Sequence, residues 1–320
     1  MPTLLLTRSE VETALVPSAL LPLLRDAFVA YSVAGGVRAQ RVRSGLPGPG
    51  TATVLFPGVV PGVPAYTVKV HAKFPAETPA IRGVLCLHEI ATGSLLAVMD
   101  STHLTAVRTG LAGALAAHVL ARPDADRVAV IGAGVQGRHQ LQTLAMLRPL
   151  RDVVVYDVLP ERAAAFAGAM TAELGIAMTP VDALTTATTG RDVLLVATWA
   201  REPFIGPGML SPGTHVTTLG ADEPGKAEVA AAVIRDALFV CDDRELAIDV
   251  GALAGVGLGA GSVGAELGEV LAGAHPGRTS AAQITVYGGV GLAFQDAAAA
   301  WVVYQAARAR GLGRAVDFLA

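Results

Sequence analysis

Aromatic residues are scarce in this chain of 320 residues, where Phe, Trp and Tyr together make up 5% of the sequence. Hydrophobic residues make up 52%, so the core must be built mainly from Ala, Val and Leu. Basic residues never gather into a run, and the formal net charge is −3. This composition argues against nucleic acid or a membrane surface as a partner.

Cysteine is rare as well. Cys86 and Cys241 each lie in an apolar segment without CxxC or Cys/His spacing, which is typical of reduced, buried thiols in a cytoplasmic protein. The N-terminal residues lack the basic and apolar regions of a signal peptide, and the uncharged stretch 250–265 is too short to cross a bilayer. We therefore expect a cytoplasmic protein without a membrane partner.

Signatures of metal sites and of serine hydrolases are also missing. The seven histidines form neither HxxxH nor HExxH, and no GxSxG sequence occurs. The sequence therefore predicts no metal ion and no nucleophilic serine.

The second half of the chain alternates short Val-rich runs with Ala-rich helical patterns. Buried β-branched runs separated by helices predict a parallel sheet covered on both faces, which is the doubly wound (Rossmann) α/β fold. The predicted strands are 127–131, 152–156, 192–198, 214–220 and 237–242, and the predicted helices are 136–147, 160–174 and 226–235.

The first half differs, because its strand-like runs are linked by Pro/Gly turns and suggest an antiparallel or mixed sheet in an α+β unit. We expect helices at 17–34, 105–121 and 293–310, and strands at 65–70, 83–89 and 94–100. A last strand-like run, 284–289, precedes the final helix, and 251–264 is expected to form a glycine-rich loop at the edge of the nucleotide domain. The last helix is expected to pack back on the first domain. The predicted domains are therefore 1–122 with 293–320, and 123–292.

A dinucleotide-binding motif lies in "AVIGAGVQGRHQ" (129–140), where Gly132, Gly134 and Gly137 follow a strand and open a helix. The first glycine permits the tight turn, the second lets the backbone approach a pyrophosphate, and the third allows close helix packing. Asp157 follows the next strand, where a carboxylate binds the ribose hydroxyls, and no Arg comes immediately after it, which favours NAD over NADP. The alternative interpretations are that the glycines serve only a strand-to-helix turn and that Asp157 is only a solvated residue at the end of a strand.

Six segments together resemble the ornithine cyclodeaminase and mu-crystallin family: "LLAVMDSTHLTAVRTGLAGALAAHVLA", "VAVIGAGVQGRHQLQTL", "VATWAREPFI", "VTTLGADEPGKAEV", "GAELGEVLAG" and "VGLAFQDAAAA". They cover nearly the whole chain in the family's order. The resemblance implies a homodimer, with a discontinuous substrate-binding and dimerisation domain and an NAD-binding Rossmann domain. It also implies hydride exchange between nicotinamide and the α-carbon of an amino or imino acid.

The resemblance further implies that Arg43, Lys69 and Arg108 hold the substrate carboxylate, a role that suits buried cationic donors. Arg41 is the alternative to Arg43 in this role, since the alignment can slip by two residues. The other interpretation of all these basic residues is that they are ordinary surface charges. Lysine occurs only at Lys69, Lys73 and Lys226 in a chain that otherwise uses arginine.

Asp222 matches the family's acidic residue, whose carboxylate handles the substrate amine, so Asp222 and Lys69 are the candidate catalytic residues. The alternative for Asp222 is the N-cap of a helix beginning near Pro224. Besides the three glycines and Asp157, further cofactor contacts are expected from a last group of residues: Thr109, Val135, Gln136, Thr198 and Gly220.

Two positions depart from the cyclodeaminase pattern. Val54 replaces the acidic residue that binds a distal amine, and Gly288 with Gly289 replaces a polar pair. We therefore predict an NAD-dependent oxidoreductase acting on a small amino acid or its imine. The alternatives are a cyclodeaminase that releases ammonia from a diamino acid such as ornithine, and a non-catalytic binder of nucleotide and small ligands like mu-crystallin.

Overall fold

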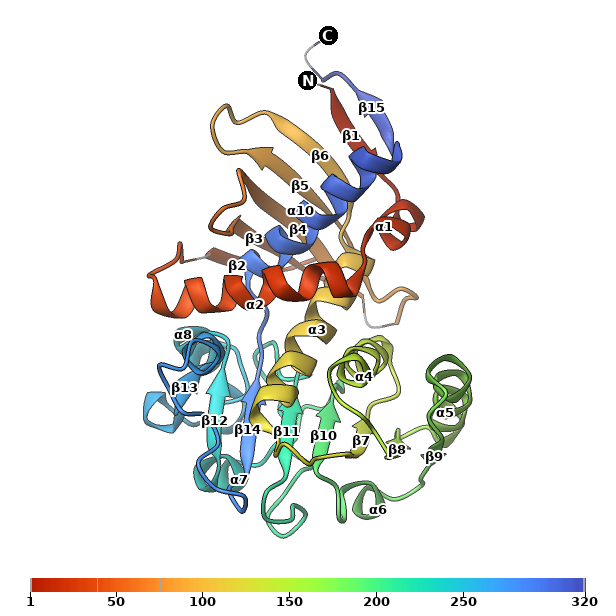
Figure 1. Cartoon of the computed structure of the whole chain (residues 1–320), viewed down its shortest axis with the longest axis vertical. Coiled ribbons are helices and arrows are strands. Elements are labelled where there is room, and N and C mark those ends of the chain that lie inside the picture. The colour runs from red at the N-terminus through yellow and green to blue at the C-terminus, as the bar shows by residue number, and fades with distance from the viewer. Residues whose placement is uncertain (1, 39, 75, 319) are drawn as a thin grey trace. The chain divides into compact units, whose positions relative to one another are not determined.

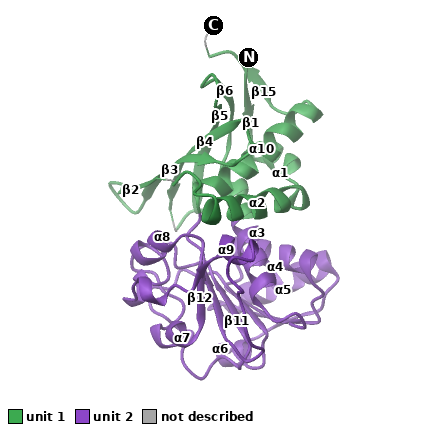
Figure 2. Ribbon diagram, turned by 60° about the vertical axis from the view of Figure 1, so that its left-hand side comes forward, with its two compact units in different colours: residues 1–108, 292–320 green, residues 109–291 purple. Residues whose placement is uncertain are grey.

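The computed structural model describes residues 2–38, 40–74, 76–318 and 320, and it divides into two compact units (Figure 2). Unit 1 comprises residues 1–108 and 292–320, and unit 2 comprises residues 109–291. The division falls inside helix α3 (Thr102–Leu120), earlier than the predicted boundary at 122. The reason is that Ala114, Ala117 and Ala121 belong to the hydrophobic core of unit 2.

Unit 2 is built on an eight-stranded sheet with the order β13-β12-β14-β11-β10-β7-β8-β9 (Figure 1). Every strand pair in it is parallel, and the α/β doubly wound fold class is confirmed. The strands are β7 (Arg127–Ile131), β8 (Asp152–Tyr156), β9 (Met178–Pro180), β10 (Val193–Val196), β11 (His215–Thr218), β12 (Leu238–Cys241), β13 (Ala265–Glu266) and β14 (Thr285–Gly288).

Helices cover both faces of this sheet, because successive residues of each buried strand point to opposite sides. In β7, for example, Val128 and Val130 join the core under α3, α4 and α5, whereas Ala129 and Ile131 join the core under α6, α7 and α8. The helices are α4 (Val135–Leu147), α5 (Pro160–Leu174), α6 (Leu184–Thr188), α7 (Ala231–Asp236), α8 (Arg244–Asp249) and α9 (Leu267–Leu271), with 3-10 turns η1 (Ala254–Val256) and η2 (Ala260–Ser262) inside the predicted glycine-rich loop.

The helix predicted over 226–235 is wrong in its first half, because α7 begins only at Ala231. The preceding backbone is extended: the carbonyl of Glu228 accepts hydrogen bonds from the N–H groups of Phe204 and Ile205, and Val229 forms a parallel bridge with Ile205. Because these backbone groups bond to a distant loop, they are not available for the hydrogen bonds of a helix. No helix starts near Pro224, so Asp222 is not a helix N-cap.

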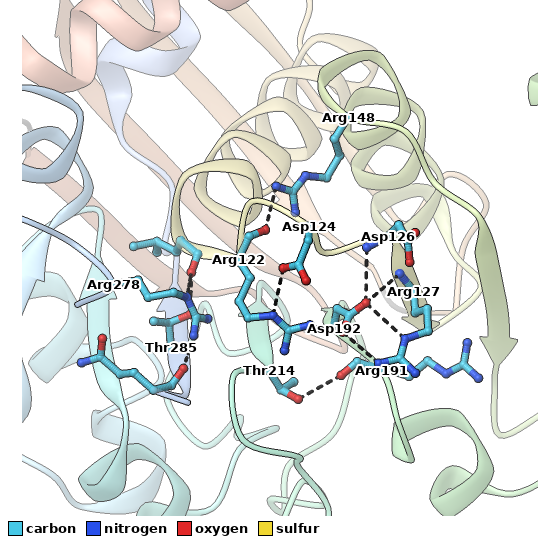
Figure 3. A network of polar contacts seen from close by, with 12 residues as sticks. Arg122, Asp124, Asp126, Arg127, Arg148, Arg191, Asp192, Thr214, Arg278 and Thr285 are labelled. Atoms are coloured by element: carbon cyan, nitrogen blue, oxygen red, sulfur yellow. Dashed lines mark hydrogen bonds and ion pairs between the residues drawn. The ribbon is translucent and has the colours of Figure 1, made fainter. Parts of the chain in front are cut away.

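The amino-terminal ends of the unit 2 strands are tied together by a polar network around the buried carboxylate of Asp192 (Figure 3). Asp192 accepts hydrogen bonds from the guanidinium of Arg122 at 2.8 Å and from the backbone N–H of Arg127 at 3.0 Å. Burial raises the pKa of Asp192, but the hydrogen bonds from Arg127 outweigh it, so this pKa lies below its ordinary value. The network is structural and lies at the end of the sheet opposite to the glycine loop.

Unit 1 contains a seven-stranded sheet with the order β15-β1-β6-β5-β4-β3-β2, antiparallel except for the parallel pair β1 and β6. Helix α10 (Ala293–Arg310) lies across β3, β4 and β5 and also packs against α2 (Figure 1). The remaining elements are β1 (Thr3–Leu6), α1 (Arg8–Ala14), α2 (Pro17–Val33), β2 (Gln40–Gly45), β3 (Thr51–Val59), β4 (Ala65–Lys73), β5 (Ile81–Glu89), β6 (Leu95–Asp100) and β15 (Arg314–Val316).

Among the described residues, no single helix has both the length and the apolarity to cross a membrane. The neighbouring helices α1 and α2 pass that test only as a pair, bent by 82° at their junction.

Candidate functional site

The glycine motif forms the turn between β7 and α4 at the carboxyl end of the unit 2 sheet. Gly132 has a φ of +98°, and a Cβ there would lie 2.4 Å from the carbonyl oxygen of Ala197. A Cβ on Gly137 would lie 2.5 Å from the carbonyl oxygen of Gly132. By contrast, no protein atom lies within 4 Å of a Cβ built on Gly134, the N-cap of α4. The turn therefore leaves open space beside the first N–H groups of α4, where a pyrophosphate fits.

Side chains around this turn also fit a nucleotide. The Asp157 carboxylate accepts hydrogen bonds from the N–H groups of Ala133 at 2.9 Å and Leu159 at 3.0 Å, so it is held beside the turn. The side-chain oxygen of Gln136 is buried without a hydrogen-bond partner among the described residues, and Val135 is 62% exposed. A ligand bound at this turn would give the Gln136 oxygen a hydrogen-bond donor and would shield the Val135 side chain from water.

Thr198 and Gly220 follow the neighbouring strands β10 and β11, and both are tied to Glu228. The carboxylate of Glu228 accepts hydrogen bonds from the backbone and hydroxyl of Thr198 at 2.6 and 2.7 Å and from the N–H of Gly220 at 2.9 Å. A fourth hydrogen bond of 2.6 Å comes from the hydroxyl of Thr218. Burial raises the pKa of Glu228, against these hydrogen bonds. This carboxylate fixes two strand ends on the edge of the predicted cofactor site.

Asp222 lies in the loop after β11 and is paired with a lysine. Lys226 donates to Asp222 at 3.0 Å and lies 3.3 Å from Glu223. The Lys226 ammonium also stands 4.2 Å from the ring centroid of Trp199, an indole that is 53% exposed. A cation on an aromatic face is attracted by the negative charge density of the ring. A carboxylate, an ammonium and an exposed indole therefore meet at the carboxyl end of the sheet.

In unit 1, Lys69 and Arg108 converge on one buried carboxylate, that of Asp296 in α10. The Lys69 ammonium lies 2.6 Å from the carboxylate, and Arg108 Nε donates to it at 2.9 Å. Lys69 also donates to the hydroxyl of Thr105 at 3.4 Å, and Arg108 to the side chain of Gln295 at 2.8 Å. Lys69 thus forms one ion pair and one hydrogen bond with its three N–H groups, and Arg108 uses two of its five N–H groups, which leaves donors for an anion.

The charges in this cluster are not balanced by Asp296 alone. Burial lowers the pKa of Lys69 to about 7, although the Asp296 carboxylate works in the opposite direction. Burial also disfavours the ionised form of Asp296, but Arg108 and Lys69 hold its pKa below the ordinary value. Two cations share a single carboxylate, so the cluster can accept a second anionic group at little electrostatic cost.

Arg43 lies on β2 and is exposed. The strand register puts Arg41, rather than Arg43, in the row of Lys69, because Arg41 pairs with Leu55 and Leu55 pairs with Lys69. Arg43 lies opposite Thr53, one row further along the same face. The charge of Arg41 contributes to lowering the pKa of Lys69, which agrees with this register. Thr109, the first residue of unit 2, is half-buried in α3.

Three residues in these clusters were missed from the sequence: Asp296, Glu228 and Lys226. Each lies inside a segment with a family motif, "VGLAFQDAAAA" or "GADEPGKAEV", yet only the fold reveals their partners. A buried acid in an alanine-rich helix is rare unless it is paired, so Asp296 could have been found from its surroundings in the sequence. Among the described residues, no group of His, Cys, Asp and Glu could hold a metal ion.

A sequence profile described as the ornithine cyclodeaminase/mu-crystallin family matches residues 1–311. An archaeal alanine dehydrogenase dimer with bound NAD is 33% identical, with a TM-score of 0.92 and coverage of 100% of both chains. A Thermococcus litoralis Δ1-pyrroline-2-carboxylate reductase in complex with NADH and L-proline is 31% identical, with a TM-score of 0.91 over 98% of this chain and 99% of that one.

A third solved structure is the iminosuccinate reductase of Paracoccus denitrificans in complex with NAD+. It is 25% identical to this chain, with a TM-score of 0.89 over 99% of this chain and 100% of that one. The three structures share both units of the fold, and all three hold the same type of nucleotide.

Proposed function

Because the chain belongs to the ornithine cyclodeaminase/mu-crystallin family, we propose that it is an NAD-dependent oxidoreductase that transfers hydride at the α-carbon of an amino acid or its imine. The observation that carries this proposal is the Lys69–Asp296–Arg108 cluster, a buried set of cationic donors with N–H groups left for a carboxylate. The open turn at Gly134 supports NAD as the cofactor. The similar alanine dehydrogenase and imine reductases support the reaction type.

Each group has a distinct task in this reaction. When bound, NAD would supply the acceptor for the hydride of the α-carbon, and the substrate nitrogen would give up a proton as the carbon–nitrogen double bond forms. Lys69 and Arg108 bind and orient the substrate carboxylate. Asp222, held by Lys226, takes up or returns the proton of the nitrogen. Arg43 is the third predicted carboxylate contact, with Arg41 as its competitor.

The reaction type can be tested by incubating the purified protein with NAD and a panel of L-amino acids. A dehydrogenase gives lasting near-ultraviolet absorbance of NADH, and the reverse reaction consumes NADH when an imino acid is supplied. Ammonia and a cyclic imino acid without net NADH would instead identify a cyclodeaminase, and tight NAD binding without turnover would identify a binder like mu-crystallin. Val54 takes the place of a cyclodeaminase's acidic residue, but it pairs with Val70 on the face opposite to Lys69, so this position does not separate the two reactions.

Cofactor choice rests on Asp157, whose carboxylate beside the turn would repel a 2′-phosphate. We expect NAD to bind more tightly than NADP, and Asp157→Ser to reduce that difference. Tighter binding of NADP by the wild-type protein would remove Asp157 from its role. A cytoplasmic location is part of the proposal and is supported by the two free cysteines.

We also propose a homodimer formed through the outer face of the unit 1 sheet. Val42, Val54, Val70 and Val84 are direct cross-strand partners and form one row over β2, β3, β4 and β5. Val42 is 55% exposed, and Val70 and Val84 are each 46% exposed. A contiguous exposed apolar row marks an association surface. Light scattering should give the mass of two chains, and Val70→Glu should give a monomer; a monomeric wild type contradicts the proposal.

A further inference from the structure

Strand β4 carries its polar side chains on the buried face, and the proposed reaction uses only one of them, Lys69. Its side chains alternate between two faces, and the buried face carries Lys69, His71 and Lys73, which are 1%, 6% and 8% exposed. The opposite face carries apolar residues such as Val70. Sheets usually bury the apolar side and expose the polar side, so this arrangement needs a functional reason.

His71 is the member of this row that lacks a partner. Both of its ring nitrogens are buried and have no hydrogen-bond partner among the described residues. Burial lowers the pKa of His71 to about 3, with Lys69 as the next cause, so the ring is neutral and offers one N–H donor and one acceptor. A buried polar group without a partner costs free energy unless a ligand or water satisfies it.

The charge around His71 indicates what kind of ligand this is. Among the ionised groups that act on its ring are the cations Lys69, Lys73 and Arg108 and the carboxylate of Asp296. The positive charge of these cations favours an anionic group as the ligand beside the ring. Alternate residues of a strand are about 7 Å apart, so His71 lies one row beyond Lys69, within reach of the other end of a short substrate.

We propose that His71 and Lys73 form a second anion subsite that selects amino or imino acids with a side-chain carboxylate, such as four- or five-carbon dicarboxylic acids. The inference rests on the proposed function for the α-carboxylate, which Lys69 and Arg108 bind. The His71 N–H then donates to the side-chain carboxylate, and the Lys73 ammonium adds its charge. The hydride step is the one already given and needs no other reactant.

A matched ligand pair tests the subsite without turnover. Succinate has two carboxylates, whereas succinamate replaces one of them with an amide of the same size. Titration calorimetry on the NAD-saturated protein should give at least about tenfold tighter binding of succinate. Equal affinities, or no binding of either compound, would overturn the subsite.

Variants then assign the preference to residues. His71→Val and Lys73→Met should each weaken succinate binding by about tenfold and leave succinamate binding within about twofold, while His71→Gln, which keeps an N–H donor, should recover part of the loss. Arg82→Met is the matched control, because Arg82 pairs with Ala72 on the opposite face of the same sheet and forms an ion pair with Glu77. Loss of binding to both ligands in a folded His71→Val protein contradicts a separate subsite.

Kinetics separate this inference from the function on which it rests. If L-alanine is oxidised with NAD and L-aspartate or L-glutamate is no better by kcat/KM, the second subsite is wrong and the proposed reaction stands. If no amino acid is turned over while succinate still binds more tightly than succinamate, the reaction is wrong and the subsite stands. Circular dichroism on each variant confirms that the substituted protein is folded.

Discussion

The two units treat buried charge in opposite ways. In unit 2, the carboxylate of Glu228 accepts hydrogen bonds from backbone N–H and hydroxyl groups, so its oxygens are hydrogen-bonded within the protein. In unit 1, Lys69 and Arg108 share Asp296 and keep N–H groups to spare. A polar network in which every donor and acceptor has a partner makes the fold rigid, whereas a network with unused donors can bind a ligand. We therefore infer that unit 2 is a rigid frame that binds a nucleotide, and that the unused cationic donors of unit 1 attract an anion.

The largest expected effect comes from removing the single acid of unit 1. Asp296→Asn leaves the Arg108 guanidinium buried without a counter-charge and should lower the free energy of unfolding by about 3–5 kcal/mol. Glu228→Gln leaves no unpaired charge and should lower it by about 1–3 kcal/mol. Urea unfolding of both variants measures the difference. Equal losses would mean that the two clusters are held together in the same way.

The next effect concerns the acid that unit 2 contributes to the chemistry. Asp222→Asn should reduce kcat by at least about 100-fold, because the amide cannot exchange the proton of the substrate nitrogen. Asp236→Asn, an exposed substitution at the end of α7, is the control and should leave kcat unchanged. Steady-state assays with the best amino acid of the panel measure both variants. Unchanged turnover in Asp222→Asn would remove Asp222 from the mechanism.

A substitution at Gly134 distinguishes an effect on the stability of unit 2 from an effect on NAD binding. A Cβ at Gly134 meets no protein atom, so Gly134→Ala should unfold at the same temperature as the wild type but bind NAD at least about tenfold more weakly. Gly168→Ala, in the exposed middle of α5, is the control: it should stabilise the fold by about 0.5–1 kcal/mol and leave NAD affinity unchanged. Full NAD affinity in Gly134→Ala would show that the pyrophosphate does not approach this turn.

The smallest expected effect is a pH dependence in unit 1. With the pKa of Lys69 near 7, its ammonium is present below that pH and is progressively lost above it. Anion binding favours the charged form, so affinity for propionate should fall severalfold between about pH 6 and about pH 9. Lys69→Met should bind propionate weakly at every pH. A wild-type affinity that does not change with pH would mean that Lys69 does not titrate in this range.

The nucleotide site could be predicted from the sequence because its parts are local. The glycines of the turn lie within six consecutive residues, and Asp157 follows at the end of the next strand. The Val-rich strands of unit 2 could be predicted for a similar reason, since continuous buried runs are typical of parallel sheets. The short strands β9 and β13 were missed. The resemblance to the family then supplied Lys69 and Arg108, whose roles remain proposals.

The partners of those residues could not be predicted, because they depend on how distant segments pack. Lys69 and Asp296 meet only because α10 crosses β4. The extended backbone before α7 depends in the same way on Ile205, which lies in another loop. One signal was nevertheless present in the sequence: in "TVKVHAK" the polar residues fall at every second position and apolar residues lie between them. Such an alternation shows that one face of a strand is polar, but only the fold shows that this is the buried face.

The exposed indole of Trp199 makes the protein its own optical sensor. The sequence has only two tryptophans, and the other, Trp301, lies in α10 of unit 1. In a Trp301→Phe background, emission would report solely on the place where Trp199 meets the Lys226 ammonium. Reduced nicotinamide absorbs at the wavelengths where tryptophan emits, so cofactor arrival at the carboxyl end of the unit 2 sheet would be visible as quenching, in real time and without a label.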